Sequence, residues 1–151
     1  APTAGSMGYG LPAAVAASLV QPHRVAINLS GDGDFLMNGQ ELATAMAHGA
    51  GRLISIVVDN GGYGTIRMHQ ERAYPGRTSG TLLANPDFAA LARAYGWAAA
   101  TVEHTEQFEP AFRAALDSGH QTLLHLRLDP DVSHTRGTLS GIRGAALARQ
   151  A

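Results

Sequence analysis

The chain has 151 residues, a formal net charge of −1 and no cysteine. This length fits one domain with its own core, and the lack of cysteine excludes disulfides and thiolate metal sites. Lysine and arginine are scattered, and no apolar run reaches transmembrane length, so we expect neither a nucleic-acid nor a membrane partner. The N-terminal stretch APTAGSMGYG has no basic or long apolar region of the kind found in signal peptides, and we expect a cytoplasmic protein.

Two features of the composition are unusual. Charged residues make up 15% of the chain, against roughly 25% in typical soluble domains. Glycine is also abundant, with 18 residues. We infer that other protein covers much of the surface, and that the backbone bends sharply or approaches a ligand at several places.

The predicted elements alternate between helix and strand along the chain. Pro12 in a first turn, Gly96 and Gly119 at helix ends, and Thr105 as a cap help to place the helices. The run LISIVV, residues 53–58, is the clearest strand. In chain order, we expect a helix over 12–20, a strand over 24–30, a helix over 38–48, a strand over 53–58, a helix over 85–95, a strand over 98–102, a helix over 105–116, a strand over 122–128 and a short helix near 141–149.

This alternation predicts an α/β fold with an open, mainly parallel sheet and helices on both faces. The two apolar runs at 24–30 and 53–58 read as buried strands. We expect one domain over residues 1–130 and a C-terminal tail over 131–151. In such sheets, ligands bind beyond the carboxyl ends of the strands.

Two of these strand ends carry oxygen donors between glycines. The first continues as Ser30-Gly31-Asp32-Gly33, and the second as Asp59-Asn60-Gly61-Gly62-Tyr63-Gly64. A carboxylate, an amide and a backbone carbonyl suit Mg²⁺ or Ca²⁺ rather than zinc. A helix expected after Gly33 would turn its N-terminus toward the same rim and favour an anion. The pattern therefore predicts a diphosphate held through a divalent metal.

Longer motifs give a resemblance to a known family. Gly31-Asp32-Gly33, followed after 25 residues (34–58) by Asp59-Asn60, resembles the GDG…NN signature of thiamine diphosphate enzymes. The segment GSMGYGLP, residues 5–12, resembles the G-x-M-G-x-G-L-P segment of acetolactate synthase-like enzymes, as do residues 38–45 and 64–67. The resemblance covers nearly the whole chain, as the C-terminal pyrophosphate-binding domain.

The resemblance implies a role for individual residues. Mg²⁺ would be held by the Asp32 carboxylate, the Asn60 amide oxygen and the Gly62 carbonyl. Backbone N–H groups of Gly33 and Asp34 would bind the diphosphate of thiamine diphosphate. The Gly5 carbonyl would accept a hydrogen bond from the cofactor's 4′-amino group, and Met7 would support its bent conformation. The complete cofactor-binding set implied is Gly5, Ser6, Met7, Gly31, Asp32, Gly33, Asp34, Asn60, Gly62, Tyr63 and Gly64.

The sequence departs from the family pattern at two positions. Asp59 replaces the first Asn of the NN pair, which is not an expected metal ligand. Asp34 follows GDG where Ser is common, and its carboxylate would repel a diphosphate unless it faces away; we expect that it does. Simpler interpretations also remain: Asp32 as a turn or cap residue, Asn60-Gly61 as a hairpin turn, and Met7 as a core residue.

The resemblance also implies partners. The activating Glu of the family lies on a separate pyrimidine-binding domain, usually from the neighbouring subunit, and nothing here resembles that domain. We therefore expect no catalytic residue in this chain, a fragment of a longer enzyme, and a homo-oligomer when full length. The substrate would be a small 2-keto acid, cleaved by decarboxylation and possibly joined to an acceptor. The segment 65–77 lacks the Trp associated with true acetolactate synthases, so the exact reaction stays open.

Histidine roles and other functions stay open as well. His69 is a candidate for substrate contact, and His134-Thr135-Arg136 lies in a tail that often closes over the site. His48, His104, His120 and His125 have no ligand spacing, and we interpret them as surface or core residues. The alternative function is a degenerate, non-catalytic domain that serves oligomer assembly, for which Asp59 and Asp34 are the only support. A nucleotide- or flavin-binding domain is disfavoured, because the chain has no phosphate loop of that kind.

Overall fold

A computed structural model describes residues 5–134 and 137–150. Two compact units form within it. The first unit contains Ala1–Asp59 and Asn85–Arg127, and the second contains Asn60–Ala84 and Leu128–Ala151. Each unit is described by itself below. No helix among the described residues is both long enough and apolar enough to span a membrane.

The first unit is built on a four-stranded sheet in the order β1-β2-β4-β3. All three strand pairings are parallel, which confirms the predicted open α/β fold. The strands are β1 (Ala26–Gly31), β2 (Leu53–Asp59), β3 (Ala98–Val102) and β4 (Thr122–Arg127), and the helices are α1 (Gly10–Val20), α2 (Asp32–Asn38), α3 (Glu41–Ala47), α5 (Phe88–Ala94) and α6 (Thr105–Ser118).

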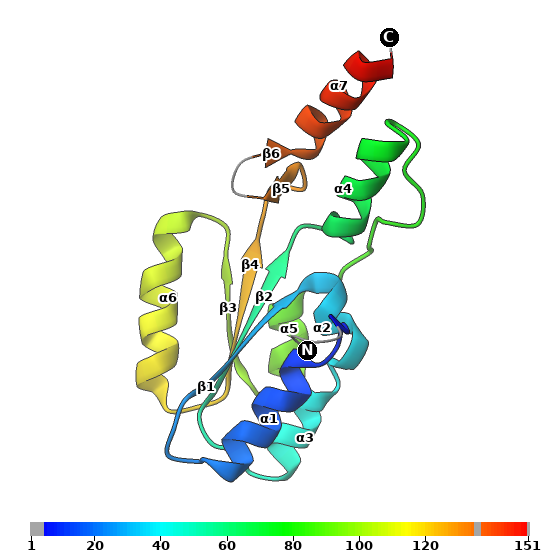
Figure 1. Ribbon diagram of the computed structural model, residues 1–151. Helices are drawn as coiled ribbons and strands as arrows, with labels where there is room; N and C mark the ends of the chain where they lie inside the picture. Colours follow the sequence, from blue (N-terminus) through cyan, green and yellow to red (C-terminus); the bar gives the residue numbers. More distant parts are fainter. Residues whose placement is uncertain (1–4, 135–136, 151) are drawn as a thin grey trace. The chain divides into compact units, whose positions relative to one another are not determined.

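Helices cover both faces of this sheet, but unequally (Figure 1). On one face, α1, α2, α3 and α5 enclose the larger core, in which Trp97 donates its indole N–H to the Leu42 carbonyl at 3.1 Å. On the other face, α6 packs on β3 and β4 and places Phe108 and Phe112 against a smaller core. The larger core consists of Leu11, Ala14, Val15, Phe35, Leu42, Ala45, Ala50, Leu53, Val57, Phe88, Ala92, Trp97 and Leu123.

Strand β1 differs from the buried strand expected from its apolar residues. Ile27 and Leu29 are 51% and 68% exposed, whereas Asn28 and Ser30 are buried. The reason lies in the layers: α1 packs on the face that carries Asn28, while α6, on the opposite face, packs mainly on β3 and β4. The expectation of a fully buried strand was therefore wrong for β1, although β2 matches it.

Local signals explain most helix boundaries. Helix α5 begins after Asp87, whose carboxylate accepts the Ala90 N–H at 2.9 Å; this bond lowers the pKa of Asp87. Helix α6 is capped by His104 rather than by the expected Thr105, and Gly119 ends it with a φ of 70°. A helix was expected after Gly33, but helix bounds were given only for 38–48; the structure has a separate helix, α2, that begins at Asp32 itself.

The second unit contains helices α4 (Gly64–Ala73) and α7 (Leu139–Gln150) and a two-stranded antiparallel ribbon of β5 (Val132–His134) and β6 (Gly137–Thr138). Helix α4 packs on α7. Glu71 on α4 has no exposed surface and accepts the Arg143 Nε–H at 2.8 Å. This ion pair lowers the pKa of Glu71 to about 2. The contacts group 128–151 with 60–84, and the boundary expected at residue 130 stays a prediction.

Candidate functional site

The carboxyl ends of β1, β2 and β4 lie along one edge of the sheet, because the strands are parallel. The register pairs Gly31 with Val58 and Asp59 with Arg127. Asp32 follows β1 directly, and Asp59 is the last residue of β2. The fold therefore carries both acidic residues to the edge at which ligands of open α/β sheets bind.

Asp32 is buried, with 3% of its surface exposed. Its Oδ1 accepts the Gly33 N–H at 2.9 Å, and its Oδ2 accepts a hydrogen bond from Asn85 Nδ2 at 2.7 Å. A buried carboxylate is costly unless hydrogen bonds or ions compensate its charge. Asp32 is therefore a buried carboxyl group that these hydrogen bonds hold in place at the sheet edge, and not an exposed turn residue.

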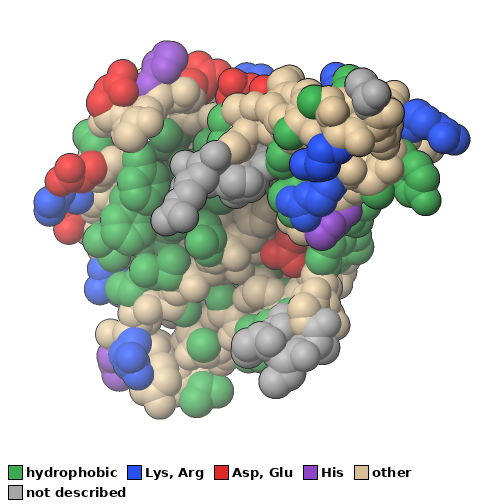
Figure 2. Space-filling view, turned by 45° about the horizontal axis from the view of Figure 1, so that its top comes forward, with side chains coloured by type: hydrophobic (Ala, Val, Ile, Leu, Met, Phe, Trp, Pro, Cys, Tyr) green, Lys and Arg blue, Asp and Glu red, His purple; other side chains and the backbone are tan. Residues whose placement is uncertain are grey.

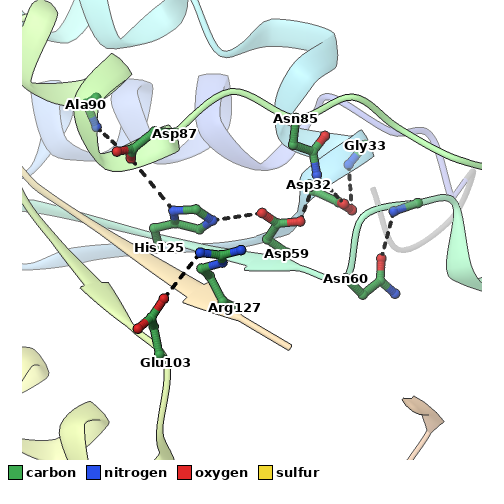
Figure 3. A network of polar contacts seen from close by, with 11 residues as sticks. Asp32, Gly33, Asp59, Asn60, Asn85, Asp87, Ala90, Glu103, His125 and Arg127 are labelled. Atoms are coloured by element: carbon green, nitrogen blue, oxygen red, sulfur yellow. Dashed lines mark hydrogen bonds and ion pairs between the residues drawn. The ribbon is translucent and has the colours of Figure 1, made fainter. Parts of the chain in front are cut away.

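Asp59 is joined to the same network (Figure 3). Asn85 Nδ2 donates to Asp59 Oδ1 at 2.7 Å, and His125 Nε2 lies 2.8 Å from Asp59 Oδ2. The side chains of His125 and Asp59 are 6% and 14% exposed. The His125 ring also lies edge-on to Phe88, with ring centroids 5.2 Å apart. Asp59, which departs from the family pattern, thus has two well-defined partners.

Asn60 begins the turn that opens the second unit. Its Oδ1 accepts the Gly62 N–H at 3.2 Å, and the Gly62 carbonyl accepts the Gly64 N–H at 2.9 Å. Tyr63 donates its N–H to the Thr81 carbonyl at 2.9 Å. Amide and backbone carbonyl oxygens each have two lone pairs and can accept more than one hydrogen bond or metal contact. No hairpin forms here, since α4 begins at Gly64.

The glycines near these residues serve different purposes. Gly61 has a φ of 72°, which a side chain rarely tolerates. A Cβ at Gly64 would lie 2.6 Å from Asn60 Nδ2, so this glycine makes room for the Asn60 side chain. Gly31 differs: its φ of −70° suits any residue, and a Cβ there would meet nothing within 4 Å. Gly31 therefore leaves open space beside Asp32 that the fold does not fill.

Helix α2 holds the N-terminal segment through Gly8. Asp34 Oδ1 accepts the Gly8 N–H at 2.6 Å, and Asn38 Nδ2 donates to the Gly8 carbonyl at 2.8 Å. The Asp34 carboxylate is thereby engaged with backbone of this chain. Met7 is 43% exposed, so it is not a core residue of this unit. Gly5 and Ser6 are exposed as well.

The predicted site residues fall in both units. Gly5, Ser6, Met7 and Gly31–Asp34 belong to the first unit, and Asn60, Gly62, Tyr63 and Gly64 to the second. His69 is exposed on α4. Thr135 and Arg136 of the expected tail lie outside the described residues. Among the described residues, no group of three or more histidine and acidic side chains is arranged to hold a metal, although amide and carbonyl ligands are not part of such a group.

The sequence interpretation missed Asn85 and His125 as members of the site. Asn85 looks like part of a helix start, and His125 lies inside an apolar strand with no ligand spacing. The register reveals His125, because it pairs Val57 with His125 and so places His125 beside the end of β2. Asn85 is revealed by its bonds to Asp32 and Asp59. Asp59 was the signal in the sequence that could have indicated them, because an acidic residue at the end of a buried strand needs hydrogen-bond donors around it.

Comparison with known proteins gives a consistent result. The family described as "Thiamine pyrophosphate enzyme, C-terminal TPP binding domain" matches residues 1–126. The large subunit of acetolactate synthase isozyme 2 from Escherichia coli K12 is 39% identical over 126 residues, which are 83% of this chain and 23% of that protein. A probable 2-ketoarginine decarboxylase from Pseudomonas aeruginosa is 39% identical over 123 residues, 82% of this chain and 22% of that protein.

A solved structure is similar too. The thiamine diphosphate-dependent 4-hydroxybenzoylformate decarboxylase of Rhodococcus jostii has a TM-score of 0.74 and 35% identity, and the match covers 82% of this chain and 23% of that one. The chain thus spans less than a quarter of the length of these relatives. Its sheet, its two motifs and these likenesses agree, and the chain belongs to the thiamine pyrophosphate enzyme family, matching its C-terminal TPP-binding domain.

Proposed function

We propose that this chain binds the diphosphate of thiamine diphosphate through Mg²⁺. Asp32 would supply a carboxylate, Asn60 an amide oxygen and Gly62 a backbone carbonyl, a set of hard oxygen donors that suits Mg²⁺. The observation that carries the proposal is the Asp32 carboxylate, buried and held by hydrogen bonds at the sheet edge. The open space beside Gly31 supports it, because a ligand can approach the backbone there.

The two departures from the family pattern do not favour a degenerate domain. Asp59 is held by Asn85 and His125, and Asp34 by the Gly8 N–H. Both carboxylates thus have partners within the first unit. An Asp34 side chain bonded to Gly8 leaves its own backbone N–H as the group offered to a diphosphate. This supports the enzyme-domain proposal over a scaffold that only assembles an oligomer.

For the parent protein, we propose a thiamine diphosphate-dependent enzyme that acts on a small 2-keto acid by decarboxylation, possibly with carboligation. The names of the relatives, acetolactate synthase and 2-ketoarginine decarboxylase, support this class. When bound, the cofactor supplies the electron sink for cleaving the bond beside the keto group. A pyrimidine-binding domain, from a neighbouring subunit of a cytoplasmic homo-oligomer, would supply the activating Glu. This chain's own share is to bind and orient the diphosphate, so alone it would be inactive.

The direct test is calorimetric titration with thiamine diphosphate, with and without Mg²⁺, on this chain and on the complete protein that contains it. We expect binding that requires Mg²⁺ and is weaker in the chain alone, where half of the cofactor's contacts are missing. Asp32→Ala should abolish it. Asp117→Asn is the matched control, since it removes one exposed carboxylate from α6 of the same unit. Absence of binding in both proteins, with circular dichroism showing a folded sheet, would overturn the proposal in favour of the scaffold.

A further inference from the structure

The network around Asp59 has a fixed order of donors and acceptors. An ionised Asp carboxylate can only accept hydrogen bonds, whereas an Asn amide nitrogen carries two hydrogens. Asn85 Nδ2 lies 2.7 Å from Asp32 Oδ2 and 2.7 Å from Asp59 Oδ1. The amide must therefore turn its nitrogen toward both carboxylates, because its oxygen would face two acceptors. Figure 3 shows Asn85 between the two acidic side chains.

This orientation of Asn85 carries a cost. Its Oδ1 is buried and has no hydrogen-bond partner among the described residues. A buried polar atom without a partner destabilises a fold. The amide is thus oriented by its contacts with the two carboxylates and not by its oxygen.

The far end of the network is equally constrained. Asp59 Oδ2 accepts from His125 Nε2, so the ring proton must lie on Nε2. His125 Nδ1 has no hydrogen-bond partner among the described residues; the nearest acidic oxygen, on exposed Asp87, is 4.0 Å away. The edge-on contact with Phe88 fixes the plane of the ring. His125 therefore anchors one Asp59 oxygen and leaves the other for Asn85.

We propose that Asn85 is a positioning residue for Asp32, and that the Asp59–His125 pair holds Asn85 in the orientation this requires. The proposal rests on the proposed function, since it concerns the carboxylate assigned to Mg²⁺. Without the Asn85 N–H groups, the two carboxylates would lose the donor that they share, and Asp32 would lose one of the hydrogen bonds that fix its orientation. Residues that orient a metal ligand in this way typically change metal affinity by roughly 10- to 100-fold when they are replaced.

The first test compares Asn85→Ala with Ser55→Ala in the complete protein. Ser55 accepts a buried hydrogen bond from Asn28 at 3.0 Å in the same sheet, but it is not part of this network. We expect Asn85→Ala to raise the Kd of Mg²⁺-dependent thiamine diphosphate binding by roughly 10- to 100-fold. Ser55→Ala should lower Tm similarly and leave the Kd unchanged. A Kd within about twofold of wild type in a folded Asn85→Ala protein would overturn the positioning role.

The second test uses His125 and stays decisive if Asn85→Ala fails to fold. His125→Gln retains a nitrogen donor at about the place of Nε2, whereas His125→Leu removes it. We expect His125→Gln to restore most of the affinity that His125→Leu loses. Equal affinities for the two variants would show that the Nε2 donor of His125 is not needed to hold Asp59 and Asn85 in place. If wild type itself shows no Mg²⁺-dependent binding, the proposed function fails. If wild type binds and the variants bind with the same Kd as wild type, only the positioning inference fails.

Discussion

Asn85 Nδ2 and Asp59 Oδ1 lie 2.7 Å apart although 25 residues, 60–84, separate them in the chain. Asp59 ends a strand of the first unit, and the whole of the intervening segment belongs to the second unit. The bond therefore joins the two points at which the chain leaves the first unit and returns to it.

Asp59→Asn restores the Asn of the family pattern and should be mild. The new amide can keep its oxygen toward Asn85 and turn its nitrogen toward His125, provided that His125 Nε2 becomes an acceptor. We expect the His125 ring proton to move from Nε2 to Nδ1, with a change in cofactor affinity of less than about threefold. Nitrogen-15 NMR of the imidazole distinguishes the two tautomers. An unchanged tautomer in the variant would contradict the donor order argued above.

The bonds from α2 to Gly8 should hold the N-terminal segment in place. Asn38→Ala removes the donor to the Gly8 carbonyl, and Asp34→Ala removes the acceptor of its N–H. We expect amide hydrogen exchange at Gly8 to accelerate about fivefold in each variant, because a net hydrogen bond contributes roughly 1 kcal/mol. Leu36→Ala, a change at an exposed position of the same helix, is the control. Exchange at Gly8 equal to the control would show that α2 does not hold the segment.

The Glu71–Arg143 pair predicts an acid-sensitive contact between α4 and α7. The pKa of Glu71 is lowered from 4.5 to about 2 by its bond to Arg143. A lowered folded-state pKa stabilises the folded form above the unfolded value and loses this effect as pH falls through the folded value. We expect protection of α4 and α7 amides, corrected for intrinsic exchange, to fall at least about tenfold between pH 5 and pH 2.

Variants of the same pair separate this effect from general acid unfolding. Glu71→Gln should already show low protection at pH 5 and a flatter pH profile. Glu109→Gln is the control, because the Glu109–Arg113 pair on α6 is 72% exposed on both sides and should contribute little. The same acid-dependent loss in Glu71→Gln as in wild type would assign it to other carboxyl groups.

The exposed face of β1 predicts an unusual tolerance to polar substitution. Leu29→Thr should change Tm by less than about 2 °C, because Leu29 is 68% exposed and surface changes rarely exceed 0.5 kcal/mol in size. Leu53→Thr, at a fully buried position of β2, should lower Tm by roughly 5 °C or more. Leu29→Thr should also raise the solubility of the isolated chain. A large loss of Tm in Leu29→Thr would show that this face is covered.

Much of the fold followed from sequence because local signals agreed with the final packing. LISIVV forms β2, residues 98–102 form β3 as expected, and Gly96 and Gly119 end their helices with positive φ. The outcome for β1 could not be predicted, since which face of a strand is covered depends on helices placed by the tertiary fold. Ile27 and Leu29 look like core residues until α6 is seen to pack mainly on β3 and β4.

The residues of the candidate site were also predictable only in part. Asp32 and Asn60 could be named as candidates from motif spacing, because each follows the end of one of two paired parallel strands. His125 could not, since it is 66 residues from Asp59 and its role depends on the register of β4 against β2. Asn85 was hidden for a related reason: its role depends on two carboxylates that meet only in the folded sheet.

The bond between Asp59 and Asn85 also bears on how the chain could be engineered. A connection whose two ends are already held together needs little length to close, and loop-closure entropy depends only weakly on what lies between. The 60–84 segment is therefore a natural exchange point: a short glycine-serine linker, or a foreign domain with adjacent termini, could replace it and leave the four-stranded sheet able to fold. A minimal version of the first unit made in this way would isolate Asp32 and its hydrogen-bond network for spectroscopy.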